Sequence, residues 1–381
     1  MAGDRGGPPG RLVLGVLLSA LLASCGVPPA SSSPLASTPS PSAGDVVAEA
    51  QAVIAVQLAA HRAWPAPPAG PAAVGPRAIA YIGADMDNGG IAGVYDGVAE
   101  AAGVIGWTVV RYDGKASVDG RTLAFEEALA GHPDGIILGG FDPEEQPTAM
   151  AEAQARHIPV VGWHAGPGSG PDGNGALFAN VTTDPVEVAQ LAADFVIASS
   201  GGHAGVAIFT DSQYQIAVEK ADVIRARLQA CGGCEVLAIE DTPIATAKEA
   251  MPPIVSSLLG RFGARLDYLV AINGNYFAGS AIALAKAGRS GAGAPYAVAA
   301  GDGDTSELAR IRARQYQAAS VAEPLPLQGW QLVDELNRAF AGRPPSGYVA
   351  PPALITLKTV PAGGVVDPQG YRAQFKAIWR P

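Results

Sequence analysis

A regular alternation of short β-rich runs and helical segments begins at Arg77 and continues almost to the end of the chain. In its first half, the alternation predicts strands over 77–85, 107–113, 133–142 and 158–166, with helices over 90–106, 120–132 and 145–157 between them. Strands that alternate with helices in this way predict a parallel sheet covered by helices on both faces.

The alternation restarts after a glycine-rich stretch at 166–175. Here the predicted helices cover 185–200, 215–230, 246–262, 275–288, 305–314 and 326–342, and the predicted strands cover 203–211, 234–241, 266–274, 295–304, 317–324 and 352–360. Pro252 and Pro253 predict an interruption of the helix at 246–262, because proline removes a backbone donor. The sequence therefore predicts two successive α/β halves, each about the size of one domain.

The N-terminal region has the pattern of an export signal. Arg5 and Arg11 precede the apolar run 12–22, which is too short to cross a bilayer as a helix. The following "LASC" resembles the lipobox of bacterial lipoproteins, which implies cleavage after residue 24 and a diacyl lipid on Cys25. An ordinary signal peptide with a chance cysteine is the alternative. Residues 25–45 are rich in Ser and Pro and predict a solvated tether. Residues 46–76 predict a helix outside the main fold, either free or packed on the body, followed by a Pro-rich linker.

Composition excludes several classes of partner. The net charge is −10 and is spread without long runs, which disfavours nucleic acid and anionic lipid as ligands. The membrane contact that we expect is the lipid anchor alone.

Two cysteines remain after Cys25. Cys231 and Cys234 lie at the predicted end of a helix, where a thiolate is disfavoured, and no further zinc ligands are nearby. A structural disulfide is favoured in an exported protein, with free thiols as the alternative.

Several segments in order resemble the type I periplasmic binding proteins, the sugar-binding subunits of ATP-driven importers. They cover 80–102, 132–164, 269–288, 297–336 and 371–379. The resemblance implies two Rossmann-like lobes joined by three crossovers, near Thr182, Ala322 and Pro351, that close over a ligand. The lobes would comprise 77–182 with 323–350, and 183–322 with 351–360, followed by a tail at 361–381. LacI-like repressors share these lobes, but they carry a basic DNA-binding segment where this chain has an export signal.

Ligands of open α/β sheets lie beyond the carboxyl ends of the strands, so the residues that follow each predicted strand are candidate ligand contacts. In the first lobe these are Asp85, Asp87, Asn88, Trp163 and His164. Asp87 or Asn88 could instead cap a helix, and Trp163 could be a core residue. An indole face at position 163 could stack on a sugar ring.

In the second lobe the candidates are Asp211, Gln213, Tyr214, Asn273, Tyr276 and Asp302, and Glu323 lies at the second crossover. The resemblance implies that Asn273 and Asp302 bind sugar hydroxyls. A turn residue is the alternative for Asp302, and a solvated hinge charge is the alternative for Glu323.

These candidates are rich in carboxylates and amides and poor in Lys and Arg. We therefore expect a neutral sugar or polyol as ligand. The resemblance implies an ABC permease and ATPase as partners, and the export signal implies an extracytoplasmic location. We expect a monomer that is not an enzyme. No cofactor and no metal site are predicted. A ligand-sensing subunit for a receptor or kinase is the alternative function, and a lipid-anchored hydrolase is a weaker one.

Overall fold

The computed structural model describes residues 43–59, 64–65, 67–166, 168–171 and 175–380. The predicted signal peptide, Cys25 and most of the predicted tether lie outside these residues. Within them, no helix combines the length and the apolar character that crossing a membrane requires.

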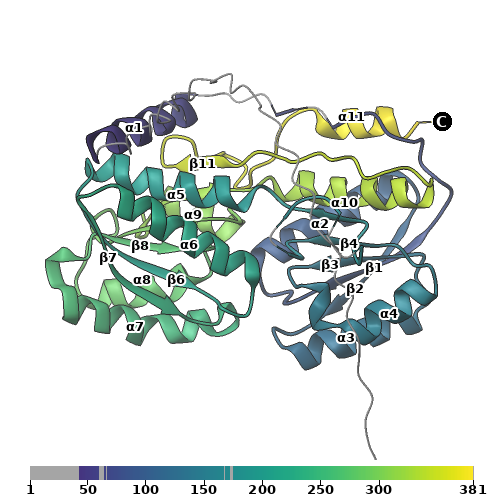
Figure 1. The fold of residues 1–381 in the computed structure, drawn as a ribbon, viewed down its shortest axis with the longest axis horizontal. Coiled ribbons are helices and arrows are strands. Elements are labelled where there is room, and N and C mark those ends of the chain that lie inside the picture. The colour runs from purple at the N-terminus through teal and green to yellow at the C-terminus, as the bar shows by residue number, and fades with distance from the viewer. Residues whose placement is uncertain (1–42, 60–63, 66, 167, 172–174, 381) are drawn as a thin grey trace, which may run out of the picture. The chain divides into compact units, whose positions relative to one another are not determined.

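The first sheet has five parallel strands in the order β2-β1-β3-β4-β5. The strands are β1 (Ala78–Gly83), β2 (Thr108–Asp113), β3 (Gly135–Gly139), β4 (Val160–Trp163) and β5 (Ala179–Val181). On one face α2 (Gly89–Val104) packs with α10 (Leu325–Phe340), and on the other α3 (Val118–Ala130) packs with α4 (Pro147–Ala155) (Figure 1). The predicted parallel sheet with two covered faces is confirmed.

The second sheet has six strands in the order β11-β10-β9-β8-β6-β7. They are β6 (Ala204–Thr210), β7 (Cys234–Asp241), β8 (Tyr268–Ala271), β9 (Tyr296–Ala299), β10 (Gln317–Ala322) and β11 (Ala353–Thr356). The helices of this half are α5 (Pro185–Ser200), α6 (Gln215–Ala230), α7 (Ala247–Phe262), α8 (Tyr276–Lys286) and α9 (Thr305–Ala313). Strand β11 is antiparallel to β10, so the second sheet is mixed rather than wholly parallel.

The two sheets have separate hydrophobic cores, and the chain passes between them several times. It leaves the first sheet after β5, returns after β10 to place α10 on the first core, and goes back to form β11. These passes match the three predicted crossovers. The predicted tail then crosses back to the first lobe, where its helix α11 (Tyr371–Ile378) packs on the first core. There, the rings of Trp330 and Trp379 are stacked with centroids 5.4 Å apart.

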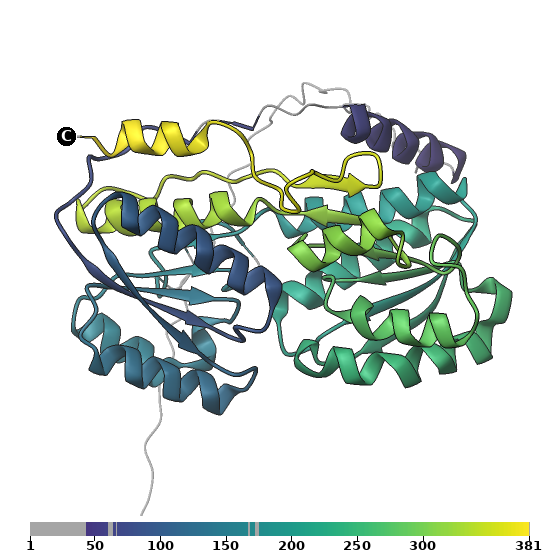
Figure 2. The same cartoon turned by 180° about the vertical axis from the view of Figure 1, so that it is seen from behind.

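The N-terminal helix belongs to the folded body. Helix α1 (Ala43–Ala59) packs on α5 and buries Val46, Ala50 and Ile54 in the second core (Figure 2). These three residues are four apart, so they form one apolar stripe on the helix. The helix therefore packs on the body, which the sequence had left open, and it begins inside the predicted tether of residues 25–45.

Two local features bear on the sequence predictions for the second half. Helix α7 is continuous through Pro252 and Pro253, which corrects the predicted interruption. The carbonyl of Lys248, which Pro252 leaves without its helical partner, lies only 2.4 Å from where a Cβ on Gly279 would be, so close packing on α8 supports this turn. Cys231 and Cys234 form a disulfide between the end of α6 and the start of β7.

Candidate functional site

A cavity of about 70 Å³ lies where the carboxyl ends of strands from both sheets meet. Its walls follow β1 and β4 of the first sheet and β8 and β9 of the second, with one turn of α6. The polar and aromatic groups that line it are Asp85, Asn88, Trp163, His164, Tyr214, Lys220, Asn273 and Asp302. Apolar residues that include Ile91, Ile216, Ile244 and Ile272 complete the lining.

Trp163 and His164 form a stacked pair at the end of β4. Their rings are nearly parallel, at 11°, with centroids 3.9 Å apart. The indole N–H of Trp163 donates to Gln328 Oε1 at 2.9 Å, and only 2% of Trp163 is exposed. Because His164 covers one face of the indole, Trp163 acts mainly as a buried support for the imidazole. The predicted stacking of Trp163 on a sugar ring is not favoured by this arrangement.

Asp85 and Asn88 are held by the loop between β1 and α2. Asn88 is the N-cap of α2, and its Oδ1 accepts hydrogen bonds from the N–H groups of Gly90 and Ile91. Asn88 therefore both caps the helix and lines the cavity. Asp85 Oδ1 accepts from the N–H of Asp87 at 2.9 Å. Burial raises the pKa of Asp85 against the lowering effect of this hydrogen bond.

The second sheet contributes Asn273 and Asp302. Asn273 follows β8 and is 5% exposed, and its Oδ1 accepts from the N–H of Asn275. Asp302 follows β9 with a φ of 58°, and its carboxylate lies against α2, where a Cβ on Gly90 would come within 2.8 Å of Oδ2. Glycine at position 90 therefore permits the close approach of the two lobes. Burial raises the pKa of Asp302 well above its ordinary value. The nearby ammonium group of Lys220 lowers this pKa, but by less than burial raises it.

Sequence reasoning missed Lys220. Its side chain is 4% exposed, lines the cavity from α6 and brings an ammonium group to a site that we expected to be poor in lysine. A signal was present, because Lys220 falls at helical spacing with the buried Ala217 and Ile224 on the inner face of α6. A lysine on such an apolar stripe must have either a partner or a function.

Glu323 lies behind the cavity wall at the crossover after β10, and 1% of it is exposed. Its Oε2 lies 3.1 Å from His164 Nε2 and accepts from Gln328 Nε2 at 2.8 Å, while its Oε1 lies 3.8 Å from Lys220 Nζ. Burial alone would raise the pKa of Glu323, but His164, Lys220 and Gln328 together lower it to about 2. One buried carboxylate thus joins a residue of the first lobe to a residue of the second.

The structure does not bring all predicted residues to this cavity. Asp211 is buried and accepts hydrogen bonds from the N–H groups of Gln213 and Ile244, so it fixes loops behind the wall. The hydroxyl of Tyr276 donates to the carbonyl of Thr242, which places this ring in the core. Asp211, Gln213 and Tyr276 are therefore corrections to the predicted site. Each follows a strand end, but local hydrogen bonds or packing direct it away from the cavity.

Asp87 is a further correction, because it is exposed and lines a larger outer chamber of about 710 Å³ instead. This chamber shares Asp85 and Asn88 with the inner cavity. It therefore lies next to the inner cavity and contains several charged side chains, among them Lys115, Lys248 and Arg310.

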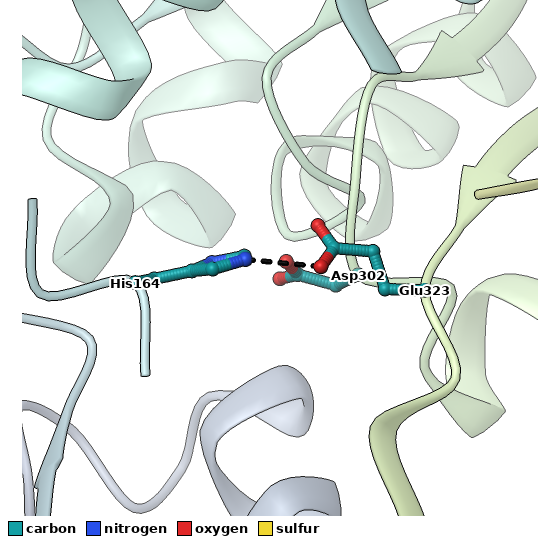
Figure 3. A group of neighbouring side chains, drawn as sticks. All are labelled: His164, Asp302 and Glu323. Carbon is teal, nitrogen blue, oxygen red and sulfur yellow. Dashed lines mark hydrogen bonds and ion pairs between the residues drawn. The ribbon is translucent and has the colours of Figure 1, made fainter. Parts of the chain in front are cut away.

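His164, Asp302 and Glu323 each offer a ligand atom, and these atoms lie within 4.8 Å of one another. Figure 3 shows the imidazole pointing toward the two carboxyl groups, with an interaction between His164 and Glu323. The ammonium group of Lys220 lies 3.8 Å from the same glutamate, and a fixed positive charge there opposes a metal cation. We assign no metal to this group.

Two α/β lobes that enclose a polar cavity at the carboxyl ends of their strands define a two-lobed solute-binding protein. Comparison with protein families agrees, because residues 79–344 match the periplasmic binding protein domain. The chain belongs to this family of binding proteins, and its two lobes have the type I fold that the sequence resemblance implied.

Solved structures show the same fold. An ABC transporter solute-binding protein from Agrobacterium vitis with bound α-D-tagatopyranose has a TM-score of 0.67 at 16% identity, covering 76% of this chain and 97% of that chain. A second protein from that organism, with bound allitol, has a TM-score of 0.64 at 18% identity over 75% and 97%. One from Bacillus halodurans C-125, with bound myo-inositol, has a TM-score of 0.63 at 15% identity over 75% and 96%. A search of curated proteins found no match.

Proposed function

We propose that this protein captures a neutral sugar or polyol outside the cytoplasmic membrane and presents it to an ABC permease and its ATPase. The supporting observation is the cavity itself, where carboxyl, amide, imidazole and ammonium groups from both lobes surround one small space. Such groups donate and accept hydrogen bonds, which suits a guest with many hydroxyl groups.

The charges around the cavity favour a neutral guest. Lys220 faces Glu323, whose lowered pKa keeps it ionised, and the raised pKa of Asp302 favours its neutral form. The charge of Lys220 is therefore balanced by that of Glu323 beside the cavity. A strongly anionic or cationic solute would leave one buried charge uncompensated.

A thermal-shift screen tests this function. Allitol, D-tagatose, myo-inositol, D-galactose and L-arabinose are offered to the purified protein, and calorimetry then measures the dissociation constant of each stabilising compound. A ligand that binds only the folded state raises the melting temperature by mass action. We expect at least one polyhydroxy compound to do so, whereas stabilisation by anions such as gluconate or sugar phosphates alone would contradict the proposal.

We also propose that residues 1–24 are a signal peptide, that Cys25 carries the lipid, and that the residues up to α1 are the tether. Mass spectrometry of the membrane fraction should find a diacylated N-terminal peptide that begins at Cys25. Cys25→Ser should release the protein from the membrane without changing its affinity for a sugar. An unmodified Cys25 in membrane-bound protein would contradict the anchor and leave the binding function intact.

A further inference from the structure

One side of the inner cavity is aliphatic. Four residues of the second lobe form this aliphatic patch: Ile216 and Ala217 in the first turn of α6, and Ile244 and Ala245 in the segment that follows β7. Isoleucine and alanine side chains neither donate nor accept hydrogen bonds. A hydroxyl group that lies against the patch therefore loses water and gains no side-chain partner there.

Buried polar groups at the end of β6 hold the aliphatic patch in place. Asp211 is 1% exposed, and its two carboxylate oxygens accept from the N–H of Gln213 at 3.0 Å and from the N–H of Ile244 at 2.8 Å. The hydroxyl of Thr210 donates to the carbonyl of Ala217 at 3.0 Å. Both halves of the patch are thus tied to the same strand end, and a guest meets them as a preformed surface.

The aliphatic patch and the polar groups lie at different ends of the cavity. Ile244 and Ala245 line both the inner cavity and the outer chamber, so this part of the patch lies at the boundary between the two spaces. Lys220, Asn273 and Asp302 line the inner cavity and do not line the outer chamber. A guest that fills the cavity therefore places one end among polar groups and the other against aliphatic side chains.

The two ends together restrict the chemistry of the guest. A hydroxyl group that is buried without a hydrogen-bond partner is costly, whereas a methyl group gains free energy by leaving water for an apolar surface. Hexoses carry a hydroxymethyl group at one end, and 6-deoxyhexoses carry a methyl group at the same position. A 6-deoxyhexose therefore offers hydroxyl groups to the inner end and a methyl group to the aliphatic patch.

We propose that the solute is a 6-deoxyhexose whose methyl group lies against the aliphatic patch, and that Ile216 and Ile244 determine the preference for this methyl group. This inference rests on the proposed function and narrows it. A 6-deoxyhexose is uncharged, so it also suits the balance between Lys220 and Glu323 beside the cavity.

The experiment uses pairs of sugars that differ by a single hydroxyl group. Calorimetry measures the dissociation constants of D-fucose and D-galactose, of L-fucose and L-galactose, and of L-rhamnose and L-mannose. In the wild type, the deoxy member of at least one pair should bind at least about tenfold more tightly than its hexose partner.

Variants of the aliphatic patch test its role in this preference. Ile244→Thr brings a hydroxyl group to the patch, and the preference for the deoxy sugar should fall below about threefold. Ile216→Thr should act in the same direction, and it replaces the first variant if that one folds poorly. Ile282→Thr is the matched control, because Ile282 is 57% exposed on α8 and lines neither chamber. Melting curves without ligand show that each variant is folded.

The outcomes are distinct. A preference for a deoxy sugar that falls in the Ile244 and Ile216 variants, and not in the control, supports the inference. The inference is overturned, with the proposed function intact, if the hexoses bind as tightly as their deoxy partners, if both patch variants keep the wild-type preference, or if only other neutral sugars bind. Failure of every neutral sugar and polyol to bind overturns the proposed function and this inference with it.

Discussion

The two walls of the cavity use their polar groups differently. In the first lobe, Asn88 caps α2, Asp85 accepts from its own loop, and Trp163 donates to Gln328, so these groups already have partners. In the second lobe, Lys220 and Asp302 face the cavity without a side-chain hydrogen bond to any described residue. The first wall therefore supplies shape, and the second wall retains donors and acceptors for the solute.

This difference indicates how a two-lobed receptor can combine rigidity with selectivity. Hydrogen bonds that are already made within the protein fix geometry, but they contribute little additional free energy when a ligand arrives. Groups that are buried without a partner gain most from a matching ligand, and they penalise a ligand that does not match. Glu323 is the link between the two walls, because it contacts His164 on one side and Lys220 on the other.

The largest expected effect comes from removing this link. Glu323→Ala leaves Lys220 buried without its counter-charge, and breaking a buried ion pair in this way costs about 3–5 kcal/mol of folding stability. Urea unfolding at pH 7 without ligand measures it. Glu235→Ala is the control, because Glu235 is exposed and pairs loosely with Arg265 at 3.4 Å, so its loss should cost under about 1 kcal/mol. Similar losses in the two variants would mean that Glu323 does not hold the walls together.

A smaller expected effect concerns pH, because the contributions of the buried acids Glu323 and Asp302 to folding stability should change with pH in opposite directions. The pKa of Glu323 is lowered to about 2, so its stabilising contribution is present above the unfolded value near 4.5 and disappears as the pH falls through 2. Relative to Glu323→Gln, the wild type should lose about 3 kcal/mol between pH 5 and pH 2. Urea unfolding at several pH values gives both curves.

Asp302 should show the opposite sign. Its pKa is raised by burial and by Glu307, Glu323 and Asp304, against Lys220, so its stabilising contribution is present at low pH and is lost as the pH rises. The wild type should therefore lose stability relative to Asp302→Asn as the pH increases from 4. If the stability difference from the wild type changed with pH in the same direction for the Glu323 and Asp302 variants, the two carboxyl groups would share one environment, which would contradict their opposite pKa shifts.

The sequence predicted most of the fold because each element has a local signal. Helical spacing, β-rich runs and the punctuating glycines gave the order of the elements, and the rule that ligands lie at strand ends found Asp85, Trp163 and Asp302. Lys220 was missed because it lies within a helix, and that rule considers only the residues that follow strands. Asp211 and Tyr276 were wrongly included because a position after a strand does not reveal whether the side chain will form a hydrogen bond with a neighbouring loop. The docking of α1 stayed open because an apolar stripe shows that a face is buried without showing what buries it.

The smallest expected effect compares one asparagine from each wall of the cavity, Asn88 from the first lobe and Asn273 from the second. Asn88→Ala should lower folding stability by about 1 kcal/mol, because the cap of α2 is lost, and should change sugar affinity little. Asn273→Ala should do the reverse, weakening binding by about tenfold while its effect on stability stays smaller, because Asn273 is not the N-cap of a helix and is buried at the cavity, whereas Asn88 is half-buried and caps α2. Asn275→Ala is a fair control, since Asn275 makes no side-chain cap bond to α8 and does not line the inner cavity. Urea unfolding and calorimetry on the three variants give both quantities. If Asn88→Ala weakens binding as much as Asn273→Ala does, then the first wall also uses its groups on the solute, because a cap that is already made could not produce such a loss.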